Sequence, residues 1–234
     1  YPNADGKVVG IKRPTYLTNI NAAKLLYIHN PKIKIFIIVR DPIERFISAY
    51  YHLSKSSYIK PVGLNQTIEK LRNQNFNIND KYNSRLYSLL SYGKFQKYSL
   101  FYKKMFKENV KIIHISELKD TSKISSKLFK FLGLNNCDVN ISSKSRPMQT
   151  VKNSSRLKIW YFLNKHLCTF NKYKNRGYGP SNLFYKYILF IYSIFDKLLK
   201  LILKDDNIEI SDENYKYLLQ YYYEDIKFVK SLLK

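Results

Sequence analysis

One apolar run followed by a charged turn constrains the fold of this chain more than any other feature. Residues 33–39 read Ile-Lys-Ile-Phe-Ile-Ile-Val, are rich in β-branched side chains, and lie between Pro31 and Pro42. A short run of this kind is typical of a buried strand in a parallel sheet. Arg40 ends the strand, and Asp41-Pro42 then predicts a helix N-terminus, because Asp caps the first amides and Pro fits the first helical position. The stretch therefore predicts an α/β protein.

The helix that follows this strand is predicted to have two different faces. Its apolar positions recur at helical spacing and are expected to pack on the sheet: Ile43, Phe46, Ile47, Tyr50 and Leu53. Arg45 and Ser48 fall on the other face, so together with Arg40 they gather where the strand ends and the helix begins. That arrangement suits a phosphate group. An ordinary strand–turn–helix with a solvated face is equally compatible with these residues.

The same residues carry a family resemblance. Residues 40–50, Arg-Asp-Pro-Ile-Glu-Arg-Phe-Ile-Ser-Ala-Tyr, resemble the 3′-phosphate-binding motif of sulfotransferases that use 3′-phosphoadenosine 5′-phosphosulfate (PAPS). Both the Arg-to-Ser spacing and the preceding apolar strand match. The resemblance implies that Arg40, Arg45 and Ser48 bind PAPS as co-substrate. It also implies a P-loop-NTPase-like three-layer α/β fold with a central parallel sheet, and the C-terminal part reads as mostly helical.

A second segment resembles the same family. Residues 10–17, Gly-Ile-Lys-Arg-Pro-Thr-Tyr-Leu, are similar to the Gly-Glu-Lys-Ser-Pro-x-Tyr-Leu segment of heparan-type and bacterial sulfotransferases. In that family the Lys faces the transferred sulfuryl group, so the resemblance implies that Lys12 stabilises charge in the transition state. Ile11 and Arg13 depart from the pattern, and Pro14 stands where the cytosolic branch has a catalytic His. The catalytic base is therefore unassigned.

The rest of the chain alternates helical patterns with one further strand, predicted over 109–115. Residues 92–95 and 131–134 (Phe-Leu-Gly-Leu) resemble the sulfotransferase segment that flanks the adenine. Gly133 is predicted to end the helix before it. Helices are predicted over 21–29, 66–73, 83–106 with a break at Gly93, 122–132, 154–167, 182–203 and 211–233.

Two late basic loops contain further candidates for cofactor binding. Many sulfotransferases close over the cofactor with a basic, Gly-containing loop that also touches the 3′-phosphate. Arg146 and Arg176 are the candidates that this resemblance suggests. A solvated basic loop is the simpler interpretation of each.

The composition is strongly basic. Lys and Arg total 41 against 17 Asp and Glu, which gives a formal net charge of +24. Such a field draws anionic partners, whether nucleotide, acidic glycan or nucleic acid. No RRM, zinc-finger or basic-zipper pattern occurs, so nucleic acid is not an expected partner. Cys137 and Cys168 lack metal-ligand spacing, and no metal is expected.

Residues 182–204 form the most hydrophobic segment of the chain. Lys186, Asp196, Lys197 and Lys200 interrupt it, so an amphipathic helix is expected in place of a membrane span. No signal peptide is recognised. The compartment stays open, with the cytoplasm expected for a bacterial-like protein and the Golgi lumen for a eukaryotic one.

In this family a Lys-x-Gly-Thr-Thr loop after the first strand holds the phosphosulfate, and no Gly-rich phosphate loop occurs in the 234 residues. Residues 1–234 are therefore expected to form a single sulfotransferase-like domain without this N-terminal strand and loop. The expected function is transfer of a sulfuryl group from PAPS to a hydroxyl or amine acceptor, with a glycan favoured. The alternative is a non-catalytic basic protein that binds nucleotides or polyanions. A nucleotide kinase would need a Walker Lys and Mg²⁺ ligands, and neither is visible.

Overall fold

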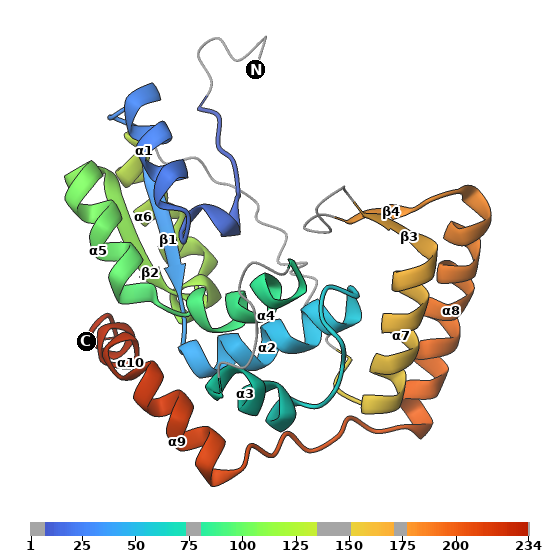
Figure 1. Cartoon of the computed structure of the whole chain (residues 1–234). Helices are drawn as coiled ribbons and strands as arrows, with labels where there is room; N and C mark the ends of the chain where they lie inside the picture. Colours follow the sequence, from blue (N-terminus) through green and yellow to red (C-terminus); the bar gives the residue numbers. More distant parts are fainter. Residues whose placement is uncertain (1–7, 74–80, 135–150, 171–176, 234) are drawn as a thin grey trace.

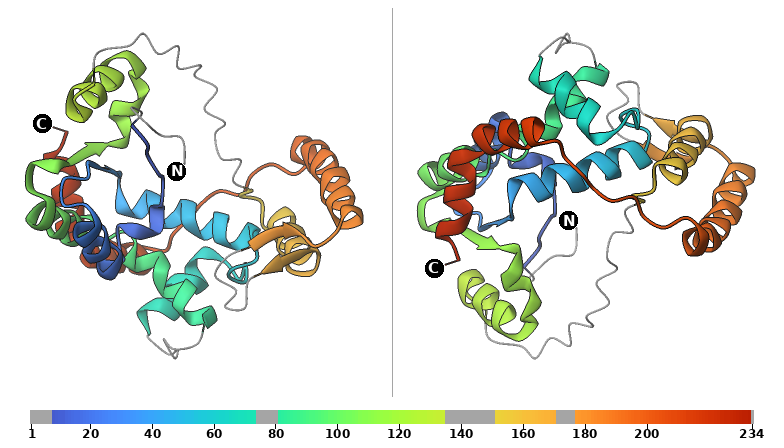
Figure 2. Two further views of the ribbon diagram at one scale, coloured as in Figure 1. Left: turned by 90° about the horizontal axis from the view of Figure 1, so that it is seen from above. Right: turned by 90° about the horizontal axis from the view of Figure 1, so that it is seen from below.

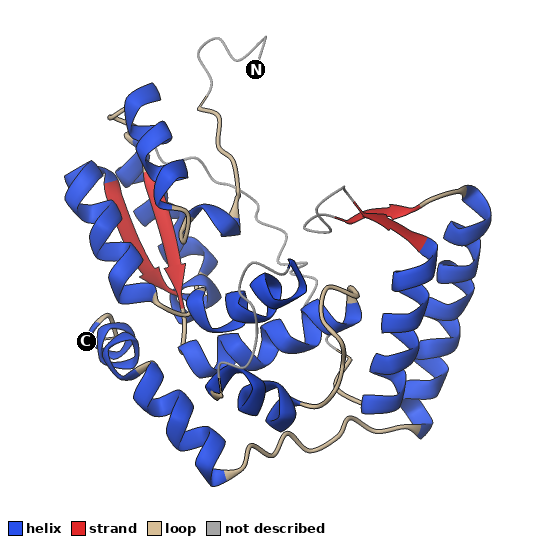
Figure 3. Cartoon of the chain, in the orientation of Figure 1, coloured by secondary structure: helices blue, strands red, loops and turns tan. Residues whose placement is uncertain are grey.

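The computed structural model describes residues 8–73, 81–134, 151–170 and 177–233 (Figure 1). This part of the chain is mostly helical and contains two small sheets (Figure 3). Strands β1 (Ile35–Val39) and β2 (Val110–His114) run parallel, with Ile37 opposite Ile112. Both strands were predicted, and the mixed α/β class is confirmed. The central parallel sheet, however, consists of this one pair within the described residues.

Helices lie on both faces of the β1–β2 pair, because side chains alternate along each strand. Ile37 and Val39 belong to a core cluster with side chains of α1 (Ile20–His29), α5 (Phe95–Phe106) and α10 (Tyr223–Ser231). On the other face, the Phe36 ring packs edge-on against Phe131 of α6 (Thr121–Leu132), with ring centroids 4.7 Å apart.

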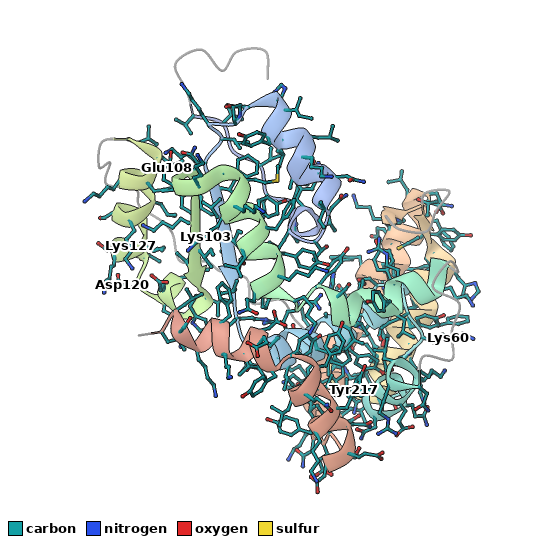
Figure 4. All side chains as sticks on the ribbon, turned by 60° about the vertical axis from the view of Figure 1, so that its left-hand side comes forward. Lys60, Lys103, Glu108, Asp120, Lys127 and Tyr217 are labelled. Carbon is teal, nitrogen blue, oxygen red and sulfur yellow. The ribbon has the colours of Figure 1, made fainter. Side chains whose placement is uncertain are left out.

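Helix α6 shows how local sequence sets the ends of an element. The Asp120 carboxylate accepts a hydrogen bond from the Lys123 amide at its start, and Gly133 ends it with a φ of 74°. Lys127, labelled on this helix in Figure 4, pairs with Glu117 at 2.6 Å. The predicted helix over 122–132 is thus confirmed.

Helix α2 (Pro42–Lys55) does not pack on the sheet, and that prediction is wrong. Its buried residues Ile43, Phe46 and Tyr50 belong to a second core cluster, separate from the one around the sheet. A two-stranded sheet is narrow, and α1 and α5 already cover its face, so α2 runs past the sheet and buries its apolar stripe among helices (Figure 1). The other helices of this second cluster are α3 (Leu64–Arg72), α4 (Lys81–Ser91), α7 (Ser154–Leu167) and α9 (Asp212–Tyr221).

The C-terminal part is mostly helical, as predicted, but includes a hairpin that the sequence did not suggest. Helix α7 leads into β3 (Cys168–Phe170), which pairs antiparallel with β4 (Gly177–Pro180) before α8 (Leu183–Ile202) returns beside α7.

The helix predicted over 211–233 is divided at Tyr222 into α9 and α10. Three short 3-10 helices complete the described elements: Pro14–Tyr16, Lys107–Asn109 and Ile115–Lys119.

Tyr222 explains why Gly93 separates α4 from α5. The Tyr222 side chain is fully buried, and its hydroxyl donates a hydrogen bond to the Leu90 carbonyl at 2.9 Å. A Cβ added to Gly93 would lie 2.6 Å from a carbon of the Tyr222 ring. Only glycine permits this close approach, which ties the C-terminal helices to the α4–α5 turn.

Helices α7 and α8 are joined by a buried ion pair. The Arg156 guanidinium donates two hydrogen bonds to the Asp196 carboxylate, at 2.7 and 2.9 Å. Their side chains are 4% and 11% exposed. No helix among the described residues combines the length and apolarity needed to cross a bilayer.

Candidate functional site

The turn between β1 and α2 is fixed by Asp41. One oxygen of its carboxylate accepts hydrogen bonds from the Ile43 and Glu44 amides, each at 2.9 Å, and Pro42 occupies the first helical position. The predicted cap is confirmed in both residues. These two helix amides are therefore already satisfied, so an anion at this turn depends on side-chain donors more than on the helix N-terminus.

Arg40 lies half-buried where β1 ends. Its Nη2 donates to the Glu44 carbonyl at 3.3 Å, which is the one hydrogen bond the guanidinium makes among the described residues. Burial lowers the pKa of Arg40, while the negative charges of Glu44 and Asp41 oppose that shift. Toward the described part of the chain, most of the guanidinium N–H groups have no partner and can donate to a ligand.

Ser48 lies on the same side of α2 as Arg45, one helical turn further along. The side chain is half-buried, and its hydroxyl makes no hydrogen bond with any residue that the structure describes. It can therefore donate to or accept from a bound group.

Arg45 does not lie on a solvated face of α2, which was the alternative interpretation of this stretch. Its Nη1 donates to the Leu89 carbonyl of α4 at 2.6 Å, and its guanidinium lies 5.3 Å from the centre of the Tyr92 ring. The Tyr222 hydroxyl, which donates to Leu90, also lies 3.2 Å from the Leu89 carbonyl oxygen and shares its hydrogen between the two carbonyls. Arg45 thus joins α2 to α4 from a largely buried position.

The electrostatics of this turn favour an anion. Burial lowers the pKa of Arg45 to about 10; Tyr222 opposes the shift, and the positive charge of Arg40 adds to it. Arg40 and Arg45 are therefore close enough for their charges to repel each other. Two partly desolvated cations that repel each other are stabilised by a negatively charged ligand between or beside them.

Lys12 is exposed and lies in the segment that precedes the 3-10 helix Pro14–Tyr16. That segment is held to α5 by the Tyr102 hydroxyl, which donates to the Tyr16 carbonyl at 2.7 Å. No described contact joins Lys12 to Arg40, Arg45 or Ser48. The structure brings the last three together at one turn and places Lys12 on a separate segment.

An open cavity of about 470 Å³ lies between the start of α1 and the α4–α5 turn. Tyr92, which contacts Arg45, is part of its wall, so the cavity adjoins the basic turn. Its lining is rich in hydroxyl, amide and aromatic groups: Thr15, Thr18, Asn19, Ile20, Asn21, Tyr87, Ser91, Tyr92 and Tyr98. Such a lining suits a polar ligand that also presents a flat or apolar surface.

Four further residues that the sequence singled out are two arginines and two cysteines. Arg146, Arg176 and Cys137 lie outside the described residues. Cys168 is a free thiol whose sulfur donates to the Asn164 side chain at 3.3 Å, and burial raises its pKa. Among the described residues, no cluster of His, Cys, Asp and Glu could hold a metal ion.

Sequence reasoning missed the groups that hold Arg45. The Leu89 carbonyl carries no sequence pattern, because any residue supplies the same backbone oxygen. Tyr222 lies within the helix predicted over 211–233, but its contact with Leu89 depends on how the C-terminal helices dock. Of Leu89, Tyr222 and Tyr92, only Tyr92 lies in a segment that resembles the family.

Comparison with known proteins agrees with the geometry of this turn. Residues 12–131 match the family described as the sulfotransferase family, and the match covers more than half of the chain. It begins at Lys12 and includes the whole β1–α2 turn with Arg40, Arg45 and Ser48. No curated protein matches the chain. The chain therefore belongs to the sulfotransferase family, a family of PAPS-dependent transferases.

Proposed function

We propose that this protein transfers the sulfuryl group of PAPS to a hydroxyl or amine of an acceptor, and that the acceptor is a carbohydrate. The observation that carries the proposal is the group of donors at the β1–α2 turn. Among the described residues, the Arg40 guanidinium makes one hydrogen bond and the Ser48 hydroxyl makes none, and Arg45 adds a second positive charge.

These residues fit the 3′-phosphate of PAPS. A phosphate dianion accepts charge-assisted hydrogen bonds, and the planar guanidinium of Arg40 can present two parallel N–H groups to it. The Ser48 hydroxyl supplies a neutral donor. Arg45, whose Nη1 is bound to the Leu89 carbonyl, contributes charge from behind the site. The Asp41 carboxylate occupies two helix amides and so leaves the binding to these side chains.

The proposed reaction requires the protein mainly to position the nucleotide and to stabilise developing charge. PAPS supplies an activated sulfuryl group for in-line transfer, by analogy with phosphoryl transfer. Lys12 stabilises the negative charge that develops on the transferring group, and the basic turn positions the nucleotide. The cavity beside Tyr92 is the proposed place for the acceptor, since its hydroxyl, amide and aromatic lining matches the mixed polar and flat surfaces of a sugar.

The experiment compares two nucleotides that differ by one phosphate. Adenosine 3′,5′-bisphosphate and adenosine 5′-monophosphate are titrated into wild type and into Arg40→Ala by calorimetry. Losing a charge-assisted contact costs about 1.5–3 kcal/mol, so Arg40→Ala is expected to weaken the bisphosphate roughly ten- to hundredfold. The monophosphate lacks the 3′-phosphate, so its affinity should not change.

Arg72→Ala serves as the matched control. It removes an arginine that pairs with Glu213 at 2.7 Å, away from the β1–α2 turn, and should leave both nucleotides unaffected. If Arg40→Ala weakens the two nucleotides equally, or weakens neither, the assignment of the 3′-phosphate to this turn is wrong.

A second candidate function is supported by the charge alone. A net charge of +24 suits a non-catalytic protein that binds polyanions through its whole surface. Such binding needs no defined arrangement of Arg40 and Ser48, so it should be insensitive to Arg40→Ala.

A further inference from the structure

Helix α8 presents its one acidic residue inwards and many of its apolar residues outwards. The side turned to α7 carries Asp196, which is bound by Arg156, and Tyr192, whose ring packs edge-on against Trp160 at 4.9 Å. A helix on a water-exposed surface normally has the reverse arrangement. The ion pair and the ring contact fix which side of α8 faces the protein.

The outer face of α8 is a continuous apolar surface. Ten of its apolar side chains are between 47% and 82% exposed. A central stripe follows helical spacing along the whole helix: Phe184, Tyr187, Ile191, Phe195, Leu198 and Ile202. Figures 1 and 2 show α8 at the outer end of the molecule, with α7 between it and α2. Contiguous exposed apolar surface of this kind marks an interaction site.

Lysines border this apolar face. Lys186, Lys197 and Lys200 are exposed and lie, by helical spacing, between the apolar stripe and the side that packs on α7. Lysines at the edge of an apolar stripe that contains Phe and Tyr are typical of helices that lie in the interface of a bilayer.

The charge of the protein indicates which kind of partner binds the outer face of α8. A second copy of the chain would bring two proteins of net charge +24 together and set their α8 lysines near one another, which is repulsive. An anionic lipid surface is complementary to both the lysines and the net charge. We propose that the outer face of α8, defined by the six stripe residues and the three lysines, binds the surface of an anionic lipid bilayer.

In this arrangement α8 lies along the membrane surface and does not cross it. At about 1.5 Å per residue its 20 residues are about 30 Å long, yet Asp196 holds one side of it against α7. The apolar stripe enters the boundary between headgroups and acyl chains, and the lysine ammonium groups reach the anionic headgroups.

The test is co-sedimentation of the full-length protein with lipid vesicles, without PAPS. Vesicles of phosphatidylcholine and phosphatidylserine in equal parts should bind the protein, and phosphatidylcholine alone should bind it far less. The double variant Phe184→Glu, Phe195→Glu should lower the affinity for the mixed vesicles by about tenfold or more, because it removes buried apolar area and adds repelled charge. The matched control is Ile28→Glu on α1, where the isoleucine is 78% exposed and far from α8 in Figure 1.

A second pair of variants isolates the charge. Lys197→Gln with Lys200→Gln should lower the affinity by roughly fivefold per lysine, with the apolar stripe intact. Lys103→Gln with Lys104→Gln removes the same charge from two exposed positions on α5 and should have a smaller effect. Unchanged thermal unfolding, followed by circular dichroism, checks that each variant folds. The lysine variants decide the question if the Phe184, Phe195 variant does not fold.

Three results would overturn the proposal. One is equal binding to both vesicle types, and another is binding that the α8 variants do not alter. The third is a wild-type dimer in sedimentation velocity that Phe195→Glu converts to a monomer, since a second copy would then cover this face. None of these measurements depends on the proposed transferase activity.

Discussion

Lys12 is the residue at which catalysis and simple binding make different predictions. If the Lys12 ammonium stabilises negative charge that develops during sulfuryl transfer, it lowers the free energy of the transition state more than that of the bound substrate. Lys12→Ala is then expected to lower kcat on the order of 10²–10³-fold, as the loss of one donor to developing charge does elsewhere. The affinity for adenosine 3′,5′-bisphosphate should change by less than about threefold. The assay follows labelled sulfate from PAPS to a panel of glycans and small hydroxyl and amine acceptors.

The control for this prediction is Lys24→Ala. Lys24 is another exposed lysine, on α1, and has no proposed role, so its loss should leave kcat unchanged. A Lys12→Ala protein that keeps its kcat but binds the nucleotide more weakly would place Lys12 in ground-state binding.

At the β1–α2 turn, contacts between residues close together in the sequence could be predicted, whereas contacts between distant residues could not. Asp41 accepts hydrogen bonds from amides two and three residues away, and Pro42 occupies the first helical position, so the sequence alone identifies the cap, and the structure confirms it. Helical spacing placed Arg45 on the face opposite the apolar stripe but could not show what covers that face. Leu89 of α4 and Tyr222 of the C-terminal helices do so, and both contacts depend on tertiary docking.

At the scale of elements, the Asp196–Arg156 pair is expected to make the stability of the α7–α8 unit depend on pH. Burial opposes ionisation of Asp196, but the hydrogen bonds and charge of Arg156 outweigh it, so the pKa of Asp196 is lowered from its ordinary 3.8. Its stabilising contribution is therefore present above about pH 4 and is lost as the pH falls through the lowered folded-state pKa.

Asp196→Asn tests this prediction. Asp196→Asn leaves the buried Arg156 with only the longer contact to Asp205, at 3.8 Å, and should cost about 3 kcal/mol at neutral pH, measured by urea unfolding. The difference from wild type should shrink as the pH falls below about 4. Glu108→Gln removes an exposed carboxylate and should show neither effect. A difference that stays constant down to about pH 3 would mean that packing, and not charge, explains the loss of stability.

Helix ends were predicted more reliably than small strands. Helices α5 and α7 end at residues 106 and 167, as predicted, and Gly133 ends α6 as predicted, because the end of an apolar period and a glycine are local causes. The β3–β4 hairpin was missed, since its strands of three and four residues are too short to show alternation. The division of the last helix at Tyr222 was also missed, because the fully buried ring packs against Gly93 from another part of the chain.

At the scale of the whole molecule, the sequence indicated apolar faces but not their partners. The stripe on α2 was expected to cover the sheet and instead lies in the helical cluster with Leu218 and Tyr222. The stripe on α8 was read as amphipathic, yet its apolar side points away from the protein and its Asp196 points inwards. Hydrophobic periodicity shows which side of a helix is apolar. The packing of the helices and strands against one another decides whether that side is buried.

The charge of the whole molecule leads to the last prediction, which separates a nucleotide site from a basic surface. A net charge of +24 attracts every anion, whereas the proposed role of Arg40 and Ser48 is to bind the 3′-phosphate of the nucleotide. A sulfated polysaccharide such as heparin should contact many lysines and lose affinity steeply with salt, on the order of 10³–10⁵-fold between 50 and 200 mM if six to ten contacts form, as for nucleic acid. Adenosine 3′,5′-bisphosphate carries few charges and should lose about tenfold or less.

Fluorescence anisotropy with labelled heparin oligosaccharides and calorimetry with the nucleotide would measure both salt dependences in wild type and in Arg40→Ala. The substitution should weaken the nucleotide and leave heparin almost unaffected, because one arginine among 41 basic residues contributes little to a diffuse field. If both ligands weaken equally with salt and neither responds to Arg40→Ala, the basic surface explains all binding. A distinct response of the nucleotide would instead require a defined site, because a diffuse field cannot single out the 3′-phosphate.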